Sequence, residues 1–232
     1  MTPASTWYPN LGAFTFPTLF VRLFPDEVEA LAAGRTDGPA AQAVIARLDG
    51  CTARLPGAVF VSGDVCAPTD SPSFAADPSV SSGAGAWRSL TGSAKVRAAF
   101  ETGRSCRIAL RPYRRMNRTR EFRLFFHGRT LRAMSQYNLD RHYARLAGRQ
   151  EALWQAGQEF AAAIAGLLPA DNQVVDVYLC SDGRFLIVDL NAWGPPTDPL
   201  LLKTWDRDWS ETAGLRLMPR PVRMTGDISV SF

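Results

Sequence analysis

Residues 174–191, VVDVYLCSDGRFLIVDLN, have the pattern of two β-strands joined by a short turn. Its two arms are rich in β-branched and aromatic residues, and Asp182-Gly183 between them is a strong β-hairpin signal because both positions tolerate positive φ. A two-residue turn at Asp182-Gly183 pairs Asp176 on one arm with Asp189 on the other. Directly opposed side chains have Cβ atoms about 4.5–5.5 Å apart, so the sequence predicts two neighbouring carboxylates on one face of a sheet.

The polar face of this hairpin predicts a cation site. Asn191 lies two residues beyond Asp189 and returns to the same face. Oxygen ligands without His or Cys suit Mg²⁺ or Mn²⁺, and Mg²⁺ takes one or two carboxylates while phosphates and waters fill the other positions. We interpret Asp176, Asp189 and Asn191 as a site for a Mg²⁺-nucleotide. The alternative is two exposed aspartates that repel weakly across water, and a three-residue turn through Ser181 would break the pairing.

The opposite face of the hairpin is predicted to be aliphatic and to lie against a core, because side chains alternate along a strand. A rigid platform of this kind would hold the polar face in place. The residues expected on the aliphatic face are Val175, Val177, Leu179, Leu186, Val188 and Leu190.

Length and composition favour a globular protein of one large domain or two intimate lobes, since the chain has 232 residues and is 46% hydrophobic. No apolar run approaches the roughly 20 residues of a membrane span, and the N-terminus lacks signal-peptide features. We therefore expect a cytoplasmic protein without membrane contact. The four cysteines show no Cys-x-x-Cys spacing, so we expect reduced thiols and no zinc site.

The net charge of +4 comes almost wholly from arginine, since Lys95 and Lys203 are the only lysines. Arginine binds phosphates through a planar fork, so this balance is compatible with anionic ligands such as nucleotides. The excess is small and dispersed along the sequence. We therefore predict no nucleic-acid partner.

Strand and helix patterns alternate along the chain, which excludes all-helical and all-β folds and indicates an α+β protein. A loop rich in Ser, Asp, Pro and Gly covers residues 62–85 and is long enough to suggest a functional segment. The longest predicted helix covers residues 140–168, with Asp140 as its N-cap and Pro169 after its end. The other expected strands are 16–24, 57–61, 106–111, 121–127 and 130–136, of which the last two form a second hairpin around Gly128. The other expected helices begin near 25, 40 and 93.

Three separated segments together resemble the cell division cycle protein 123 family, and the similarity covers most of the chain. The most specific is the last, in which an Asp-Val-Tyr arm is joined by a short turn to an Asp-x-Asn arm. An N-terminal Trp-Tyr-Pro and the segment 15–23 also resemble the opening of that family. The matching pieces are VF (59–60), APTD (67–70), LRPY (110–113), EFR (121–123), MSQ (134–136), VDVY (175–178) and VDLN (188–191).

The resemblance implies an α+β ATP-grasp fold, in which two lobes with antiparallel sheets and flanking helices enclose ATP and Mg²⁺. It implies a single unit over residues 1–232, with an N-terminal lobe of about 1–113 and a C-terminal lobe of about 114–232. Mg²⁺ would be held by Asp176, Asp189 and Asn191, in agreement with the hairpin geometry. The resemblance also places Arg111, Pro112 and Tyr113 at the interlobe hinge beside the adenine. It places Glu121 and Arg123 in the nucleotide cleft and assigns Ala67 to the nucleotide as well. Without the resemblance, Glu121 and Arg123 would be interpreted as a surface ion pair.

The chain departs from that family at two phosphate contacts. Ser62 stands where the family usually has a lysine that reaches the phosphates, and Tyr137 stands where it usually has an arginine. Each lost charge-assisted contact is expected to weaken binding by roughly 1.5–3 kcal/mol. Four arginines elsewhere in the sequence are candidates to replace these charges in space: Arg54, Arg88, Arg107 and Arg141.

Three functions follow from these observations. The first is a Mg²⁺-ATP-binding assembly factor, because the resemblance implies that eukaryotic members help assemble translation initiation factor 2; in a bacterial protein the partner would be unknown. The second is an ATP-dependent carboxylate-amine ligase that acts through an acyl-phosphate. The third is a degenerate scaffold that binds no nucleotide. The sequence identifies no catalytic residue.

The remaining polar and aromatic signals are interpreted as structural. His127 lies at a predicted turn and His142 near a predicted helix start, positions that do not suggest catalysis. Three tryptophans and three prolines follow the predicted metal residues, and either a partner-docking surface or packing over the cleft would explain them; we favour packing. These residues are Trp193, Trp205, Trp209, Pro195, Pro196 and Pro199.

Overall fold

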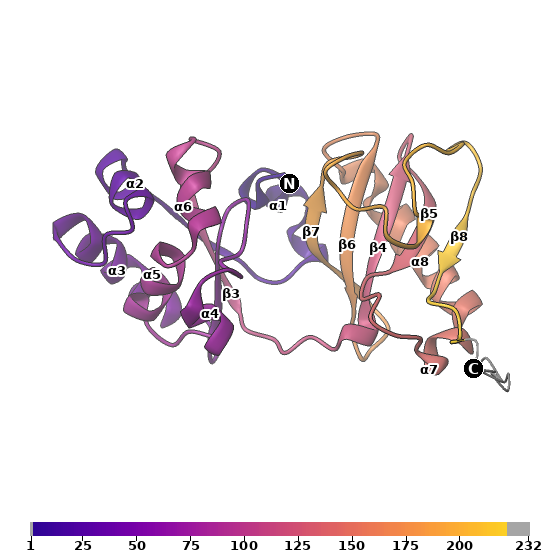
Figure 1. Cartoon of the computed structure of the whole chain (residues 1–232), viewed down its shortest axis with the longest axis horizontal. Helices are drawn as coiled ribbons and strands as arrows, with labels where there is room; N and C mark the ends of the chain where they lie inside the picture. The colour runs from indigo at the N-terminus through magenta and orange to yellow at the C-terminus, as the bar shows by residue number, and fades with distance from the viewer. Residues whose placement is uncertain (1, 222–232) are drawn as a thin grey trace, which may run out of the picture.

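The computed structural model describes residues 2–221, which form two sheets with helices around them (Figure 1). The elements of the first part of the chain are α1 (Ala4–Leu11), η1 (Gly12–Phe14), β1 (Leu19–Arg22), α2 (Pro25–Ala32), α3 (Pro39–Thr52), β2 (Val59–Gly63), α4 (Pro72–Ala76), α5 (Gly83–Thr91), α6 (Ala94–Glu101) and β3 (Arg107–Pro112). The strands form an antiparallel sheet in the order β1-β3-β2. Residues of α2, α3, α5 and α6 share one hydrophobic core with this sheet.

The second part of the chain forms a five-stranded sheet in the order β7-β6-β4-β5-β8. Its elements are η2 (Arg118–Arg120), β4 (Glu121–His127), β5 (Thr130–Gln136), α7 (Ala144–Ala147), α8 (Gln150–Ile164), η3 (Ala165–Leu167), β6 (Gln173–Leu179), β7 (Phe185–Asn191), η4 (Leu200–Leu202) and β8 (Gly214–Arg216). The pairs of β4 with β5, of β4 with β6 and of β6 with β7 are antiparallel, and β5 with β8 is parallel. The predicted α+β class is therefore present.

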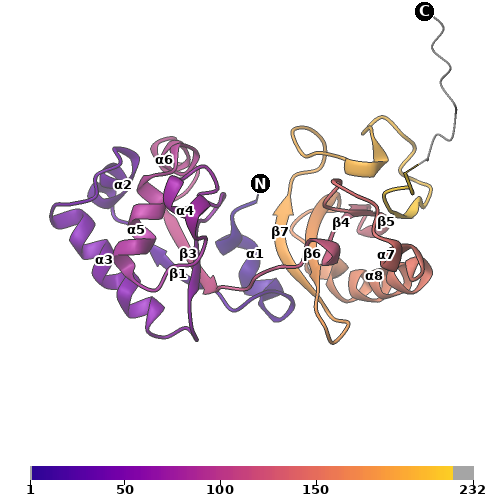
Figure 2. The same ribbon diagram turned by 60° about the horizontal axis from the view of Figure 1, so that its bottom comes forward.

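The two faces of the second sheet carry different layers, which Figure 2 shows on opposite sides of it. One face packs on α8 and α1 through a core that includes Phe122, Leu124 and Phe126. The other face is covered in part by residues 193–213, whose Trp193, Trp205 and Trp209 surround Phe125 (5.8 Å from Phe125 to each of the latter two rings). Packing rather than an exposed docking surface was expected, and the three rings do pack; they lie over Phe125, however, and line neither of the cavities between the lobes.

The β6–β7 hairpin differs from its predicted form in its turn. Cys180 N donates to Arg184 O (2.8 Å), so the turn has three residues, and Gly183 supplies the positive φ of 88° that this turn requires. The predicted two-residue turn at Asp182-Gly183 is therefore wrong. A turn longer by one residue shifts the register by one and exchanges the two faces of a strand.

A β-bulge reverses this shift before the register reaches the aspartates. Val177 pairs with Ile187 but Asp176 pairs with Asp189, so Val188 is the extra residue. The predicted pairing of Asp176 with Asp189 is thus confirmed although the predicted turn is wrong. The aliphatic face changes as well: Phe185 and Ile187 lie in the core. Leu186 and Val188, which were predicted there, are partly exposed instead.

The N-terminal helix α1 was not predicted, and it connects the two parts of the molecule. Trp7 and Leu11 are fully buried in the core of the second sheet. Ser5 is bound to Asp64, which follows β2 of the first sheet: Ser5 N and Oγ donate to the two carboxylate oxygens at 2.7 and 2.6 Å. We propose a first lobe of residues 15–113 and a second lobe of residues 114–221, which keeps the predicted boundary near 113. Residues 2–14 are set apart from the first lobe because α1 packs against both lobes.

The helix predicted over 140–168 is divided in the structure. Asp140 is not its cap, because its Oδ1 accepts from the Tyr143 hydroxyl (2.9 Å) while α7 and α8 are separated at Gly148 and Arg149. Glycine has the weakest helix propensity after proline, which explains the interruption there.

The predicted loop over 62–85 contains the short helix α4 and the start of α5. All four cysteines are free thiols, as expected.

Among the described residues no helix is long and apolar enough to cross a membrane.

Phe125→Ala tests the aromatic layer of the second sheet. Phe125 is fully buried between the tryptophans, so the substitution is expected to lower the free energy of unfolding by about 3–5 kcal/mol. Equilibrium unfolding in urea measures this loss. Phe24→Ala is the matched control, because that ring is 59% exposed and its removal is expected to cost less than about 1 kcal/mol. Equal losses in the two variants would contradict the assigned packing.

Candidate functional site

Two cavities lie between the sheets, on either side of a contact between the two lobes. Arg111 of β3 donates from Nη1 to the carbonyl oxygen of Val188 in β7 at 3.1 Å, and both residues line both cavities. The Arg111 Nε is buried without a hydrogen-bond partner among the described residues. Burial lowers the pKa of this guanidinium, while the charge of Asp189 acts against that shift.

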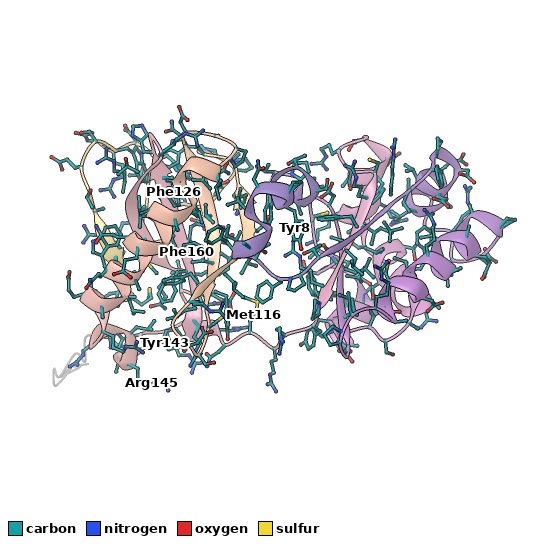
Figure 3. The ribbon with its side chains drawn as sticks, turned by 180° about the vertical axis from the view of Figure 1, so that it is seen from behind. Tyr8, Met116, Phe126, Tyr143, Arg145 and Phe160 are labelled. Atoms are coloured by element: carbon teal, nitrogen blue, oxygen red, sulfur yellow. The ribbon has the colours of Figure 1, made fainter. Side chains whose placement is uncertain are left out.

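The first cavity is apolar, with a volume of ≈ 80 Å³. Rings and aliphatic groups from both lobes and from the connecting segment make its wall; Figure 3 shows Met116 of that segment between the two lobes. Its lining residues are Phe16, Phe60, Arg111, Pro112, Tyr113, Arg114, Met116 and Val188. The predicted site residues Pro112 and Tyr113 therefore face this cavity.

The second cavity, of ≈ 110 Å³, is more polar. Ser62 and Asp64 come from the end of β2 and the turn after it, Ala67 from the next loop, and Asp189 from β7. Burial raises the pKa of Asp189 to about 7, the negative charge of Asp176 adds to the rise, and Arg111 opposes it. Asp189 forms no ion pair among residues 2–221, and its Oδ1 accepts from Leu190 N at 2.9 Å.

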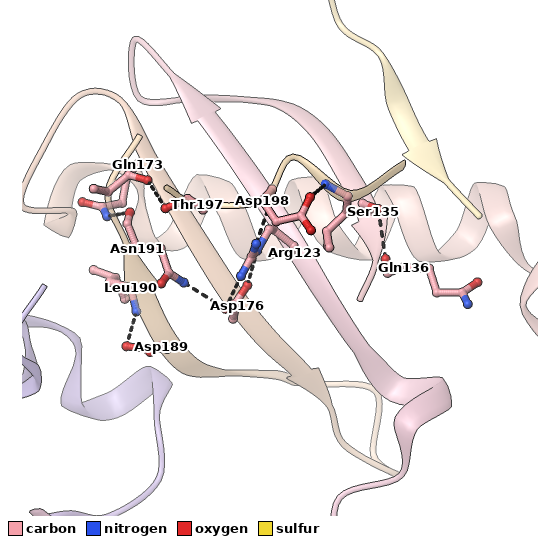
Figure 4. A network of polar contacts seen from close by, with 12 residues as sticks. Arg123, Ser135, Gln136, Gln173, Asp176, Asp189, Leu190, Asn191, Thr197 and Asp198 are labelled. Carbon is pink, nitrogen blue, oxygen red and sulfur yellow. Dashed lines mark hydrogen bonds and ion pairs between the residues drawn. The ribbon is translucent and has the colours of Figure 1, made fainter. Parts of the chain in front are cut away.

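A buried network on the same sheet face joins three other predicted residues (Figure 4). Arg123 forms a bidentate pair with Asp176, with Nε–Oδ1 at 2.7 Å and Nη2–Oδ2 at 2.9 Å. Asn191 Nδ2 also donates to Asp176 Oδ2 at 2.9 Å. Burial acts to lower the pKa of Arg123, but its hydrogen bonds and charge interaction with Asp176 outweigh this and raise it. The ion partner of Arg123 is thus Asp176, and the alternative of a surface pair with Glu121 is not found among the described residues.

Glu121 lies at the far end of the same face. It pairs with Tyr178 across β4 and β6, and its carbonyl oxygen accepts from Tyr137 N at 3.0 Å. Burial raises the pKa of Glu121. The Tyr137 ring, which stands where the resembled family has an arginine, lies against the Arg123 guanidinium at 5.1 Å. Glu121 lines neither of the two cleft cavities described above.

The donor set fits a divalent cation in part. Asp176 is already neutralised by Arg123, and Asn191 turns its amide NH₂ toward it, whereas Asp189 is not paired. Among the described residues no three His, Cys, Asp or Glu side chains converge on one point. An ion here would rest on Asp189 and on the free amide oxygen of Asn191, with phosphates and waters as the other ligands, a pattern common for Mg²⁺. Both carboxylate oxygens of Asp176 already accept hydrogen bonds, and its role as a direct ligand stays a prediction.

The arginines suggested as replacements for the missing lysine do not reach the cleft cavities. Arg107 donates to Ser5 Oγ at 3.0 Å, and Arg141 lies 3.5 Å from Asp140. Arg54 and Arg88 are exposed on the first lobe. The cation that lines the polar cavity is Arg111, which the sequence had assigned to the adenine side.

Sequence reasoning missed Asp64 and Val188 as site residues. Asp64 stands two residues beyond Ser62 in a motif that already carried the resemblance, so its position was a usable signal. Val188 was assigned to the core because an uninterrupted alternation was assumed, and no local signal marks the bulge.

The fold is an α+β arrangement of two lobes, and the cleft between their sheets is apolar on one side and carboxylate-lined on the other. The model of the D123 family matches residues 89–214, just over half of the chain. The chain belongs to the D123 family, which confirms the resemblance found in the sequence. The two sheets with their flanking helices confirm the predicted α+β fold class.

Relatives and solved structures agree with this assignment. The chain is 38% identical over 88 residues to a protein of Danio rerio and 33% identical over 94 residues to one of Xenopus tropicalis, both called translation initiation factor eIF2 assembly protein. These matches cover 37% and 39% of the chain and 25% and 28% of the relatives. C-terminally truncated Cdc123 from Schizosaccharomyces pombe shares the fold with a TM-score of 0.79 at 20% identity, over 94% of this chain and 95% of that one.

Asp176→Ala tests the buried network. The substitution leaves the Arg123 guanidinium buried without its partner, so the free energy of unfolding is expected to fall by about 3–5 kcal/mol. Urea unfolding monitored by tryptophan fluorescence measures it. The control is Glu29→Ala, which breaks an exposed pair with Arg35 and is expected to cost about 0–1 kcal/mol. A loss for Asp176→Ala as small as the control's would show that this network adds little stability.

Proposed function

We propose that this protein binds Mg²⁺-ATP in the cleft between its lobes and acts as a binding or assembly factor for a protein partner. The observation that carries the nucleotide part is Asp189, a carboxylate without an ion pair on the wall of a polar cavity that adjoins an apolar one. A nucleotide has the same division, since its base is flat and largely apolar while its phosphates carry charge and a cation.

The apolar cavity suits the base. Phe60, Pro112 and Tyr113 offer flat or ring surfaces, and most binding pockets combine such walls with a few polar groups that fix orientation. Tyr113 N is bound to Ala58 O at 2.7 Å, which fixes the position of the segment that leaves β3. This supports the assignment of residues 111–113 to the adenine side.

The polar cavity suits the phosphates and the cation. Asp189 on the cavity wall would hold Mg²⁺ together with Asn191, which lies two residues further along β7 and does not line the cavity. Arg111 would approach the phosphates, and Ala67 lies on the same wall. Arg123 is held by Asp176 and also donates from Nη1 to the carbonyl oxygen of Asp198 at 2.7 Å. It would therefore act on the site through Asp176. We propose that Glu121 contributes to nucleotide binding at the outer end of this sheet face.

A binding role is favoured over a carboxylate-amine ligase by the distribution of charge. Phosphoryl transfer relies on several cations around the transferred group. The described residues that line the polar cavity include one arginine and no lysine, since Ser62 occupies the position of the family's lysine.

The partner is suggested by the relatives. Two curated proteins that match this chain over part of their length are called assembly proteins of translation initiation factor eIF2. We propose that the chain likewise assists the assembly of a protein complex, with eIF2 as the partner where the source organism has that factor. Size-exclusion chromatography of the chain with purified eIF2 tests this part, and separate elution of the two would contradict it.

Isothermal titration with ATP, with Mg²⁺ and then with EDTA, tests the nucleotide part. Saturable binding that is tighter in Mg²⁺ is expected for the unaltered chain. Asp189→Asn removes the carboxylate charge, so the Mg²⁺-dependent gain in affinity is expected to fall by at least about tenfold while binding in EDTA stays unchanged.

Asp182→Asn is the matched control for this titration, because it makes the same chemical change at the exposed tip of the same hairpin. Its affinity should equal that of the unaltered chain. Absence of ATP binding by the unaltered chain would refute the nucleotide proposal. Full Mg²⁺ dependence in Asp189→Asn would refute the metal assignment alone.

Ser62→Lys tests whether the phosphates occupy the polar cavity. A lysine there would add a cation to a cavity that holds one, and ATP is expected to bind about tenfold more tightly. Ser62→Met is the matched control, since it adds comparable length without charge and should not improve affinity. Equal effects of the two substitutions would place the phosphates elsewhere.

A further inference from the structure

A third cavity lies outside the cleft, at the edge of the second lobe where the tip of the β6–β7 hairpin is found. It has a volume of ≈ 330 Å³ and forms where the segment before β4, the junction of α7 with α8, and the tip of the β6–β7 hairpin meet. It shares no lining residue with the two cleft cavities. Figure 3 labels Tyr143 and Arg145 at this end of the lobe, away from Tyr8 of α1.

Three arginines from separate elements line this cavity. Arg120 ends η2, Arg145 lies in α7, and Arg149 directly precedes α8. None of the three forms an ion pair or a side-chain hydrogen bond with any residue between 2 and 221. The described lining residues include no carboxylate, whereas nearby Asp182 is already paired with Arg184 at 2.8 Å. The cavity is therefore a concentration of unpaired positive charge.

The positive charge of the chain is also concentrated in the part of the sequence that supplies these arginines. Residues 114–149 contain ten arginines and two carboxylates, an excess of +8 against +4 for the complete chain. The remaining sequence is thus net acidic. Such local excess, rather than the small total charge, determines where an anionic partner is attracted.

The floor of the cavity is aliphatic. Leu153 and Leu179 belong to the hydrophobic core of the lobe, and Leu146 packs against that core. No aromatic side chain appears among the described lining residues, so the cavity offers no platform on which a nucleic-acid base would stack. A ligand that matches both the rim and the floor carries carboxylates beside an aliphatic group.

We propose that this arginine pocket binds an acidic segment of a protein partner, with glutamate or aspartate side chains on the three arginines and a large aliphatic side chain on the leucines. Arginine forks match carboxylates in bidentate geometry, and the leucine floor excludes water from beneath them. The proposal rests on the partner part of the proposed function and is independent of the nucleotide part.

The test uses the complete chain and a fluorescent peptide of alternating leucine and glutamate, measured by fluorescence anisotropy. Saturable binding is expected, and a peptide with serine in place of leucine should bind at least about tenfold more weakly. Arg145→Glu/Arg149→Glu is expected to weaken binding of the leucine peptide by at least about tenfold. Both variant arginines are exposed, and the unfolding midpoint checks that the fold is retained.

Arg54→Glu/Arg88→Glu is the matched control, since it removes the same total charge from exposed arginines of the first lobe. It should change peptide affinity by less than about twofold. Equal weakening by the two double variants would overturn the proposal in favour of diffuse charge attraction. Failure of the unaltered chain to bind the leucine peptide, equal binding of the serine peptide, or tighter binding of single-stranded RNA of the same charge would each overturn it too.

Titration of the same samples with Mg²⁺-ATP separates the two proposals. The arginine pocket shares no lining residue with the cleft, so Arg145→Glu/Arg149→Glu should bind ATP as the unaltered chain does. Peptide binding without ATP binding would refute the nucleotide part of the proposed function and leave the arginine pocket supported. ATP binding without peptide binding would refute the arginine pocket alone.

Discussion

The extra residue in β7 determines which side chains of the second sheet reach the cleft. Without the bulge at Val188, the three-residue turn at the hairpin tip would place Asp189 on the core face, where a carboxylate without a partner is costly. With it, Val188 and Asp189 both face the first lobe, and Phe185 and Ile187 complete the core. The turn and the bulge therefore have to occur together in this chain.

The division of charge on the site face follows from this arrangement. Asp176 and Asp189 are neighbours across two strands, and Arg123 is paired with the former. Arg111 is near the latter but is held by the Val188 carbonyl oxygen. One carboxylate is therefore fixed within a network that stabilises the sheet, and the other remains available on the cavity wall. Adjacent aspartates of similar sequence context thus have different physical roles.

Sequence reasoning predicted the α+β class, the two hairpins and the Asp176–Asp189 pairing, because hydrophobic alternation and turn residues act locally. The prediction failed where contacts between distant parts of the chain determine the structure. The bulge at Val188 depends on how a longer turn is reconciled with a buried face, and the bond from Arg111 to β7 depends on how the lobes meet. Likewise, the sequence position of Asp176 gives no sign that Arg123 binds both of its oxygens.

The attachment of α1 to both lobes has a mechanical consequence. Its Trp7 is fixed in the core of the second sheet, while its first turn is bound to Asp64 beside the polar cavity. Separation of the lobes would have to lengthen or break the bonds between Ser5 and Asp64 before Trp7 could leave its core. The helix thus joins the two lobes directly, and an opening of the cleft would have to break contacts made by the first residues of the chain as well as the bond between Arg111 and Val188.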